Sequence, residues 1–280
     1  MDWTEIESGA YWPVFIASFL VVAVWETLRP RPGLTQTTAR RWGNHTVVTI
    51  LNTLISGVLF RGTAVMLAVS LAGSGFGLLN RPSLPSPASW ILAFLLLDLV
   101  RFASHRMLHA VPLLWRVHQV HHSDPDFDLS TALRVHPLEV VMTRGAYLAA
   151  VLVLAPPAGA VLAYEFVSVF HNFFGHANAS LPRWFQEWIG TVFFTPDTHR
   201  IHHSEEVWEQ NRNFGQVFTW WDRLLHTYSA EPAAGQDGMI VGLRGSQNGN
   251  SLRIAFMLTQ PFRPERSERP SPAQSPVHAP

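Results

Sequence analysis

Five long apolar runs constrain the fold of this chain more than any other feature of its sequence. They cover residues 11–28, 45–73, 88–105, 140–155 and 158–174. A bilayer crossing needs about 20 mostly apolar residues, and within lipid a helix can satisfy all of its own backbone hydrogen bonds. The last two runs are short and carry Arg144 and Glu165, so they could form a hairpin that crosses only part of the membrane. The sequence therefore predicts an all-α integral membrane bundle of four or five spans.

The 280 residues divide into three regions by composition. Residues 1–85 hold the first membrane spans, and residues 86–230 hold a third span, the hairpin and almost all the histidines. Residues 231–280 form a C-terminal extension, which we expect to be disordered after about 261 because it becomes rich in Pro, Ser and Arg. The formal net charge is zero, so no nucleic-acid partner is expected, since such a partner requires a basic surface.

The distribution of arginines predicts the orientation in the membrane. The loop after the first run carries Arg29, Arg31, Arg40 and Arg41, whereas the loop between the second and third runs carries only Arg81. Further arginines follow the third and fifth runs, and positively charged loops stay on the cytoplasmic side. We therefore expect an integral protein of a bacterial inner membrane, with its histidine-rich segments at the cytoplasmic ends of the spans.

Histidine is the unusual residue of this chain, because ten of its fourteen histidines fall in four short groups. The groups are HRMLH (His105, His109), HQVHH (His118, His121, His122), HNFFGH (His171, His176) and HRIHH (His199, His202, His203). At 5% histidine, an H-x-x-H-H pattern is expected by chance about 0.03 times in this length, and it occurs twice. A cluster of pH-sensing histidines would have no reason to repeat this spacing.

The spacing indicates metal ligands on helices. Side chains at i and i+4 share one helix face, so His105 and His109 can hold one ion together, as can the i, i+3, i+4 set of each triplet. His171 and His176 lie about 140° apart on an ideal helix, so this pair requires a helix end or a bulge. The chain has no cysteine, which excludes thiolate sites, and imidazole suits Zn, Fe, Cu or Ni. Ten histidines are too many for one ion and suffice for two.

Carboxylates could complete such a site by accepting histidine N–H groups. Asp98 lies seven residues before His105 within an apolar run, where an ionisable side chain is costly and points to function. We expect it to accept a histidine N–H. The other candidates for this supporting role are Asp124, Glu139, Asp197 and Asp222, each of which could equally be an ordinary surface or capping residue.

Several motifs in residues 90–228 resemble the fatty acid hydroxylase/sterol desaturase superfamily of membrane di-iron oxygenases. They are DLVRFASHRMLH, PLLWRVHQVHHSDPDFDLSTALRVHPLE, FFGHANASLP, TPDTHRIHHS and NRNFGQVFTWWDRLLHTY. The resemblance implies that 86–230 is a catalytic domain with a helical cytoplasmic cap around two metal ions, usually iron. The ligands it implies are His105, His109, His118, His121, His122, His171, His176, His199, His202 and His203.

The same resemblance covers residues outside the ligand set. Arg134, His136 and Glu139 match the superfamily's R-x-H-P-x-E stretch, and Asn213 with Gly215 matches its N-x-G. We expect structural or ligand-supporting roles for them, because His136 has no histidine nearby in sequence. His226 stands where relatives commonly have glycine, and we interpret it as a loop residue.

The function implied is O₂-dependent hydroxylation or desaturation of a membrane lipid, with a fatty acyl or a sterol- or isoprenoid-like chain. Two Fe ions would be the cofactor, with Zn a possible occupant after isolation, and O₂ the co-substrate. We find no haem-attachment, dinucleotide-binding or Fe–S motif, so a separate ferredoxin, cytochrome b5-like protein or reductase must donate electrons. The alternatives are a zinc-dependent membrane hydrolase, for which HExxH is missing, and a non-catalytic metal-binding or transport protein.

Overall fold

The computed structural model describes residues 2–31, 33–60, 62–80, 85–247 and 249–263. Within these ranges all regular elements are helices, and β-structure is limited to three isolated bridges. This confirms the all-α prediction. The disorder expected after about 261 concerns residues that lie, from 264 onward, outside the described ranges.

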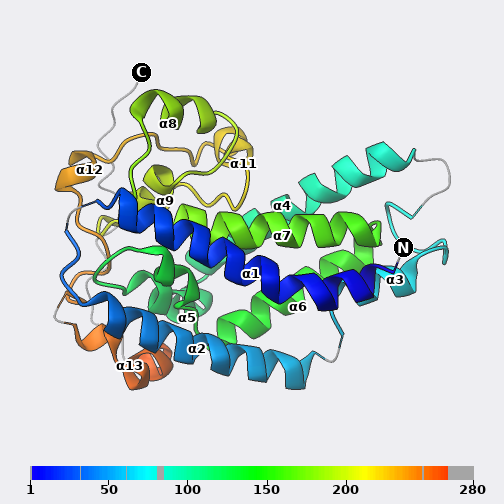
Figure 1. Ribbon diagram of the computed structural model, residues 1–280, viewed down its shortest axis with the longest axis horizontal. Helices are drawn as coiled ribbons and strands as arrows, with labels where there is room; N and C mark the ends of the chain where they lie inside the picture. The colour runs from blue at the N-terminus through cyan, green and yellow to red at the C-terminus, as the bar shows by residue number, and fades with distance from the viewer. Residues whose placement is uncertain (1, 32, 61, 81–84, 248, 264–280) are drawn as a thin grey trace.

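Five long helices run along the longest dimension of the molecule (Figure 1). They are α1 (Trp3–Leu28), α2 (Thr38–Leu59), α4 (Ser86–Ala110), α6 (Pro137–Leu154) and α7 (Ala158–Gly175). The short α3 (Ala64–Leu71) lies at the end where α4 and α7 begin. Local signals set several of these boundaries: the Asp2 side chain accepts from the first backbone N–H groups of α1, and Pro137 occupies the first turn of α6.

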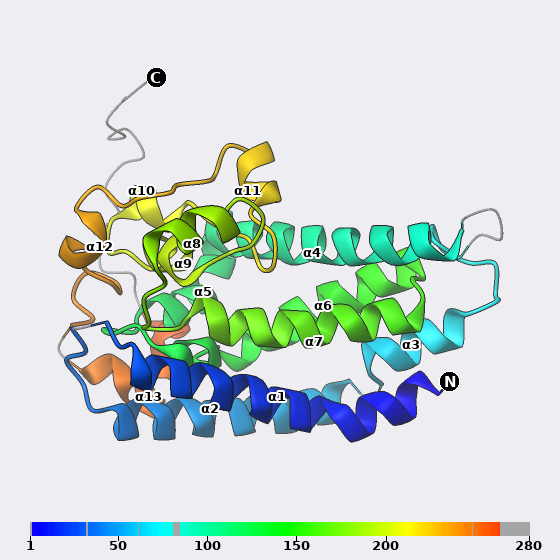
Figure 2. The same ribbon diagram turned by 45° about the horizontal axis from the view of Figure 1, so that its top comes forward.

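Four helical segments of the described chain are long and apolar enough to cross a membrane, which agrees with the prediction of four or five spans. They are Trp3–Leu28, Thr38–Leu71, Ser86–Ala110 and Pro137–Leu154. The fifth apolar run becomes α7, which is not among them. Instead α7 lies at the centre of the bundle, between α1 and α4 (Figure 2), and packs on both. A central helix is shielded from lipid by its neighbours, so it can carry polar residues that a lipid-facing helix could not.

Small residues allow α7 to pack closely. Ala158, Gly159 and Ala160 begin the helix, and an added Cβ on Gly159 would lie only 2.6 Å from the Trp90 ring and 2.7 Å from the Trp3 ring. Helix packing within lipid depends on such close contacts, because burial of apolar surface provides no driving force there.

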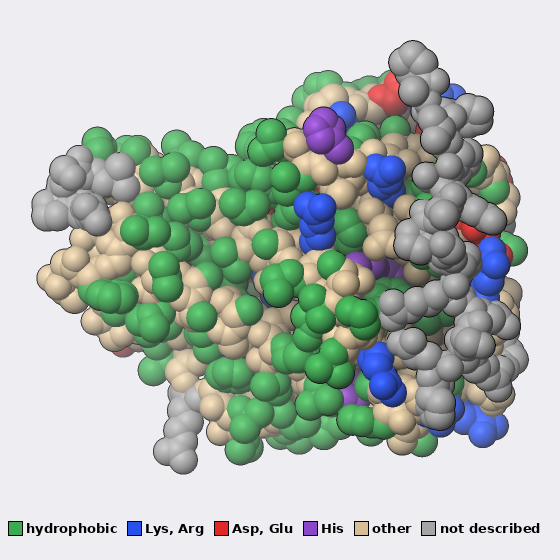
Figure 3. Space-filling model, turned by 180° about the vertical axis from the view of Figure 1, so that it is seen from behind, with side chains coloured by type: hydrophobic (Ala, Val, Ile, Leu, Met, Phe, Trp, Pro, Cys, Tyr) green, Lys and Arg blue, Asp and Glu red, His purple; other side chains and the backbone are tan. Residues whose placement is uncertain are grey.

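The outer surface of the bundle is apolar. Leu20 and Val21 of α1 and Leu54 and Val58 of α2 expose more than half of their side chains, up to 77% at Val58. In Figure 3 hydrophobic side chains cover the half of the molecule away from the cap, whereas the charged side chains visible there gather over the other half. This distribution is the one expected of a bundle embedded in a bilayer with one end in water.

Short helices form a cap over the end of the bundle where α1, α4 and α7 finish (Figure 1). They are α5 (Pro112–His122), η1 (Leu129–Leu133), α8 (Arg183–Ile189), α9 (Pro196–His202), α10 (Val207–Gln210), α11 (Trp220–Leu224), α12 (Gly235–Gly238), η2 (Asn250–Leu252), α13 (Ile254–Thr259) and η3 (Gln260–Phe262). The last three belong to the C-terminal extension and pack against α2 and α5, where Leu252 and Met257 are buried.

A buried ionic cluster joins α2 to the loop after α5. Arg41 has no exposed side-chain surface and lies 3.0 Å from Asp124, 3.3 Å from Asp126 and 3.1 Å from Asp128. Asp128 also caps η1 by accepting from the Ser130 backbone N–H. This cluster fixes the position of the segment that follows the first histidine triplet.

Candidate metal centre

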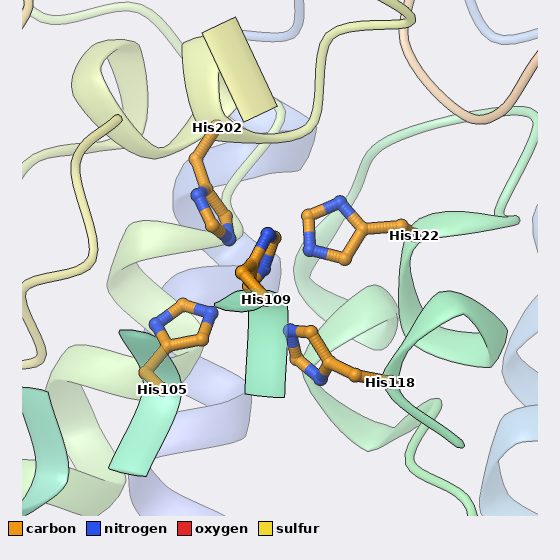
Figure 4. Close-up of side chains that lie close together, drawn as sticks. All are labelled: His105, His109, His118, His122 and His202. Carbon is orange, nitrogen blue, oxygen red and sulfur yellow. The ribbon is translucent and has the colours of Figure 1, made fainter. Parts of the chain in front are cut away.

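Nine of the ten expected histidines meet where the bundle joins the cap. Their ligand nitrogens form two groups, and within each group these atoms lie within 4.8 Å of one another. The first group contains His105, His109, His118, His122 and His202, whose rings surround a common space in Figure 4. The second contains His121, His176, His199 and His203. Four helices supply the nine side chains: α4, α5, α9 and the C-terminal end of α7.

The two triplets are divided between the groups in the same way, so neither triplet lies within a single group, as its spacing alone would allow. His118 and His122 belong to the first group, and His121 to the second. In the other triplet His199 and His203 belong to the second group, and His202 to the first. Helix geometry explains the division, because residues i and i+4 are about 40° apart around the axis whereas i+3 and i+4 are about 100° apart. Each triplet therefore contributes to both groups.

Local sequence signals position these helices. α5 begins with Pro112 in its first turn, and α9 begins with Pro196 after Thr195, whose hydroxyl accepts from the Thr198 backbone N–H. His176 follows the last residue of α7, so a helix end supplies this ligand, as its spacing required.

The ligand nitrogens of both groups lie close enough together to share an ion. In the second group the Nε2 atoms approach one another: His176 lies 3.2 Å from His121 and 2.9 Å from His199, and His199 lies 3.2 Å from His203. With metal–nitrogen bonds of 2.0–2.1 Å, two ligand atoms at right angles lie about 3 Å apart. In the first group, the Nε2 atoms of four histidines are buried and have no hydrogen-bond partner among the described residues. These histidines are His109, His118, His122 and His202.

The opposite ring nitrogen of four histidines lies within hydrogen-bonding distance of an oxygen. The Nδ1 atom lies 3.0 Å from the Phe214 carbonyl in His105, 2.8 Å from Glu139 Oε1 in His118, 2.7 Å from the Asn172 carbonyl in His176 and 2.8 Å from the Arg212 carbonyl in His202. Since these oxygens only accept, Nδ1 carries the hydrogen and donates it. The Nε2 lone pair then faces the centre, as metal binding requires.

Burial also disfavours the charged form of several of these histidines. It lowers the pKa of His176 to about 4 and that of His202 to about 3. The same cause, reinforced by neighbouring imidazoles, holds the pKa well below its usual value at His121, His122, His199 and His203. Neutral imidazole is the form that binds metal, so this set of donors fits two ions of the type that imidazole prefers, such as iron or zinc.

His171 does not join the other nine. Its Nδ1 atom lies 3.1 Å from the Val167 carbonyl of its own helix, and its ring packs among Phe170, Phe174 and Phe193. The five-residue spacing explains this position, because His176 reaches the site only from beyond the end of α7, whereas His171 is still within the helix.

Among the five candidate carboxylates, Glu139 contacts a histidine of the centre directly, through His118. Asp222 contributes indirectly. It accepts hydrogen bonds from the backbone N–H groups of Phe214 and Gly215, and so it fixes the Phe214 carbonyl that His105 contacts. Burial raises the pKa of Asp222, while its hydrogen bonds from Thr227 and these two amides lower it.

The remaining three carboxylates have other partners. Asp98, which we expected to accept a histidine N–H, instead accepts from the Tyr164 hydroxyl, the Trp221 indole and the backbone N–H groups of Val217 and Phe218. It therefore joins α4 to the loop that follows Gly215. Asp124 binds Arg41, and Asp197 forms an ion pair with Arg31.

His136 and His226, to which we gave no ligand role, lie outside the centre. His136 caps α6, where its Nδ1 atom accepts from the Leu138 backbone N–H, and it has the structural role expected for it. His226 is exposed in a turn with a φ of 58°, a conformation that favours glycine, and it is a loop residue as we interpreted it.

Sequence reasoning missed the loop carbonyls that orient His105 and His202. Both belong to the segment 212–215, in which Asn213 has a φ of 54° and its side-chain amide donates to the carbonyls of Thr198 and Ser229. The N-x-G motif was the available signal, because Asn and Gly are the residues that adopt such conformations most readily. The residue type alone does not show which backbone carbonyl accepts a hydrogen bond, because every residue has one.

A cavity of about 830 Å³ extends from the histidines into the bundle. His105, His118, His121, His176 and His199 line one end of it, and Thr4 and Glu7 at the start of α1 line the other. Its walls come from α1, α2, α4, α6 and α7. The two histidine groups are therefore accessible from within the bundle.

Comparison with known proteins places this site in a family. Residues 90–227 match the family described as Fatty acid hydroxylase. Human alkylglycerol monooxygenase is 32% identical over 149 residues, which cover 52% of this chain and 32% of the human protein. Ornithine lipid hydroxylase OlsE of Rhizobium tropici is 26% identical over 264 residues, covering 89% of this chain and 74% of that protein. Methylsterol monooxygenase erg25B of Aspergillus fumigatus is 30% identical over 172 residues, covering 52% and 51%.

The chain spans only 32% to 48% of the length of the alkylglycerol monooxygenases from human, Caenorhabditis elegans and Xenopus tropicalis. No solved structure matches it significantly. The matched region nevertheless contains all nine clustered histidines, Glu139 and the 212–215 loop. Through residues 90–227, this chain belongs to the fatty acid hydroxylase family.

Proposed function

We propose that this protein is a membrane-bound monooxygenase that hydroxylates or desaturates a C–H bond of a lipid, using O₂ and two iron ions. The observation that carries this proposal is the pair of buried histidine groups at the end of a long cavity within a membrane bundle. The three relatives are named as monooxygenases or hydroxylases, two of them after a lipid and one after a methylsterol.

The two histidine groups would each hold one ion. One iron would be bound by His105, His109, His118, His122 and His202, and the other by His121, His176, His199 and His203. When bound, the iron pair supplies the O₂ activation that oxidation of an unactivated C–H bond requires. The side chains contribute neutral ligands that need not lose a proton near neutral pH, held in place by Glu139 and the loop carbonyls.

The remaining contribution of the protein is to position the substrate. The cavity reaches the histidines from the bundle, so a lipid can bring one of its carbons to the centre without leaving the membrane. A displacement of about 1 Å can cost 100-fold in rate, so the cavity walls determine which carbon reacts. Asp98 supports one wall by joining α4 to the loop at Val217 and Phe218.

The electrons would come from a separate protein. The donor classes are a ferredoxin, a cytochrome b5-like protein or a reductase, any of which would approach the cap from the cytoplasm. An acidic donor would be attracted by the exposed arginines of the cap, such as Arg183 and Arg223.

The test combines metal content with lipid oxidation in the same membranes. Protein isolated from iron-supplied cells should hold about two irons per chain, and those cells should accumulate an oxidised lipid that is missing when the protein is missing. His121→Ala and His202→Ala should each lose iron and oxidation, whereas the exposed His226→Ala should lose neither. Full oxidation by both site variants would refute the ligand assignment.

Two tightly held zinc ions with hydrolysis of a lipid would instead identify a zinc hydrolase, and bound metal without any lipid product would identify a storage or transport protein.

A further inference from the structure

The cavity contains four charged side chains that the metal centre does not use. They are Glu7 of α1, Arg101 of α4, Arg144 of α6 and Glu165 of α7, and we call them the charged belt. Arg144 lies within electrostatic range of both Glu7 and Glu165, and Arg101 within range of Glu165. The belt therefore brings two positive and two negative groups together inside the membrane bundle.

The belt does not hold itself together by direct ion pairs. None of its four members forms a salt bridge with another residue of the described chain, although Glu7 accepts a hydrogen bond of 2.7 Å from Thr63. The Nε atom of Arg144 is buried without a hydrogen-bond partner among those residues, and its guanidinium lies 5.5 Å from the centre of the Phe60 ring. Arg101 similarly lies 5.8 Å from the centre of the Tyr147 ring.

Charged side chains at this depth are expensive, and most that occur there serve a ligand or a transported ion. Packing alone does not account for the four belt residues, because all of them line a cavity of about 830 Å³ and none forms a salt bridge with a described residue. A bound ligand with complementary charges would supply the missing hydrogen bonds.

We propose that the charged belt binds a zwitterionic polar group of the lipid substrate, with its carboxylate on Arg101 and Arg144 and its ammonium on Glu165 and Glu7. The proposal rests on the lipid oxidation proposed above and specifies the class of lipid. The belt has two acidic and two basic side chains, so a zwitterion offers each of the four a partner of opposite formal charge. An anionic group alone would give the glutamates no hydrogen-bond donor, and an uncharged one would give none of the four groups a charged partner.

The position of the belt also limits which carbon is oxidised. Arg101 and His105 are four residues apart on one face of α4, a rise of about 6 Å. Arg144 is five residues beyond Glu139, whose carboxylate contacts His118. A polar group held at Arg101 therefore lies about one helical turn from His105, whereas the Glu7 end of the belt lies farther from the histidines. Trp12, Phe15 and Leu148, which also line the cavity, provide apolar surface for the chain of the lipid.

Three labelled probes with the same chain test this inference. N-dodecanoyl-ornithine carries a carboxylate and an ammonium, N-dodecanoyl-norvaline only the carboxylate, and N-dodecanoyl-putrescine only the ammonium. Binding of each is measured on the full chain in lipid nanodiscs, with and without iron, and partition into empty nanodiscs is subtracted. We expect the ornithine probe to bind at least 10-fold more tightly than either of the others, since a lost charged hydrogen bond corresponds to about that factor.

Two charge-removing variants should then give opposite patterns. Arg144→Gln should weaken the ornithine and norvaline probes about 10-fold or more and leave the putrescine probe within about 2-fold. Glu165→Gln should weaken the ornithine and putrescine probes and leave the norvaline probe unchanged. Arg183→Gln and Glu187→Gln on the exposed face of α8 are the matched controls and should change none of the three.

Equal loss of all three probes, or no loss, in both variants would overturn the inference, as would tightest binding of an uncharged dodecylglycerol. If Arg144→Gln loses its iron or no longer unfolds cooperatively, Arg144→Lys provides the alternative variant. It keeps the positive charge without the planar guanidinium, and it should weaken binding of the two probes that carry a carboxylate and not that of the putrescine probe. The two proposals fail separately. If the two variants show the opposite binding patterns but no lipid is oxidised, the oxygenase proposal is refuted and the belt site stands. If lipid is oxidised but neither variant changes the binding of any probe, only the belt site is refuted.

Discussion

Each histidine of the centre has two nitrogens, and the protein gives them different surroundings. At His105 and His202 the outer nitrogen meets a backbone carbonyl, and at His118 it meets Glu139. An oxygen on the outer nitrogen fixes the tautomer and increases the basicity of the inner one. The affinity of this site for a metal should therefore depend on these outer partners as well as on the candidate ligands.

Glu139→Ala tests this supporting role. The substitution removes the oxygen 2.8 Å from His118 Nδ1, so His118 can rotate or adopt the other tautomer. We expect a 10- to 100-fold loss of iron affinity, in line with other residues that orient a ligand. Competition with a chelator of known affinity measures this loss, and Glu187→Ala, which is exposed on α8, should not change it. Unchanged affinity in Glu139→Ala would mean that packing alone orients His118.

A second prediction at this scale concerns protons. Burial lowers the pKa of His202 to about 3 and that of His176 to about 4, whereas histidine in an unfolded chain titrates near 6.5. These two side chains are therefore already neutral at pH 6, and metal binding at this pH should release almost no protons from them. Calorimetry in two buffers with different protonation enthalpies measures the release, and the free peptide 115–125 should release more protons per metal. Several protons released per metal by the whole protein would show that the histidines are charged before binding.

The sign of the stability effect follows from the same shifts. Because the folded pKa lies below the unfolded one, the stability contributed by neutral His176 and His202 is complete above about pH 6.5. It is lost as the pH falls toward 4 and then 3. Metal-depleted protein should therefore unfold at progressively lower temperature over this interval, and an unfolding temperature that stays constant from pH 6.5 to 4 would contradict the shifts.

At the scale of single helices, two short elements divide their histidines in the same way. α5 and α9 each place an i, i+4 pair in one group and the intervening histidine in the other. The repeated spacing in the sequence predicted that each triplet contributes to a metal centre, but it could not show that the triplets interlock. That arrangement depends on how α5 and α9 face each other, which is a property of tertiary packing.

The position of α7 was also beyond the sequence. Its apolar run predicted part of a membrane hairpin, whereas its central position follows from the packing of α7 against α1 and α4, which is a property of the tertiary structure. The same limit applies to Asp98, since a helical-face argument placed it near His105 and could not reveal the closer donors in the 217–221 loop.

Arg41 is the residue on which the junction between α2 and the cap depends. It is fully buried against Asp124, Asp126 and Asp128, and its removal would leave three carboxylates close together without a cation. We expect Arg41→Met to lower the free energy of unfolding by about 3–5 kcal/mol, the usual cost of breaking a buried ion pair. Reversible unfolding in detergent measures this difference. Arg183→Met, whose ion pair with Glu187 is exposed, should cost at most about 1 kcal/mol, and equal effects of the two would show that the Arg41 cluster is not important for stability.

At the scale of the whole molecule, the fold separates a lipid-facing half from a polar half and places the metal centre where they meet. The exposed leucines and valines of α1 and α2 belong to the first half, and the cap forms the second. The cavity crosses this boundary, from the start of α1 to the histidines. A substrate therefore needs a long apolar part and a reactive carbon that reaches the polar end, which fits a membrane lipid better than a soluble metabolite.

The orientation of this arrangement can be measured directly, because the chain contains no cysteine and single cysteines can be introduced without a prior removal. His226 is exposed in the cap, and Ala72 is exposed just after α3 at the opposite end of the molecule (Figure 1). The arginine distribution predicts that the cap is cytoplasmic. A membrane-impermeant thiol reagent should therefore label Ala72→Cys in intact cells and His226→Cys only in inverted vesicles. The reverse pattern would place the metal centre on the outer side and exclude cytoplasmic electron donors, while labelling of both variants in intact cells would mean that the bundle does not span the membrane.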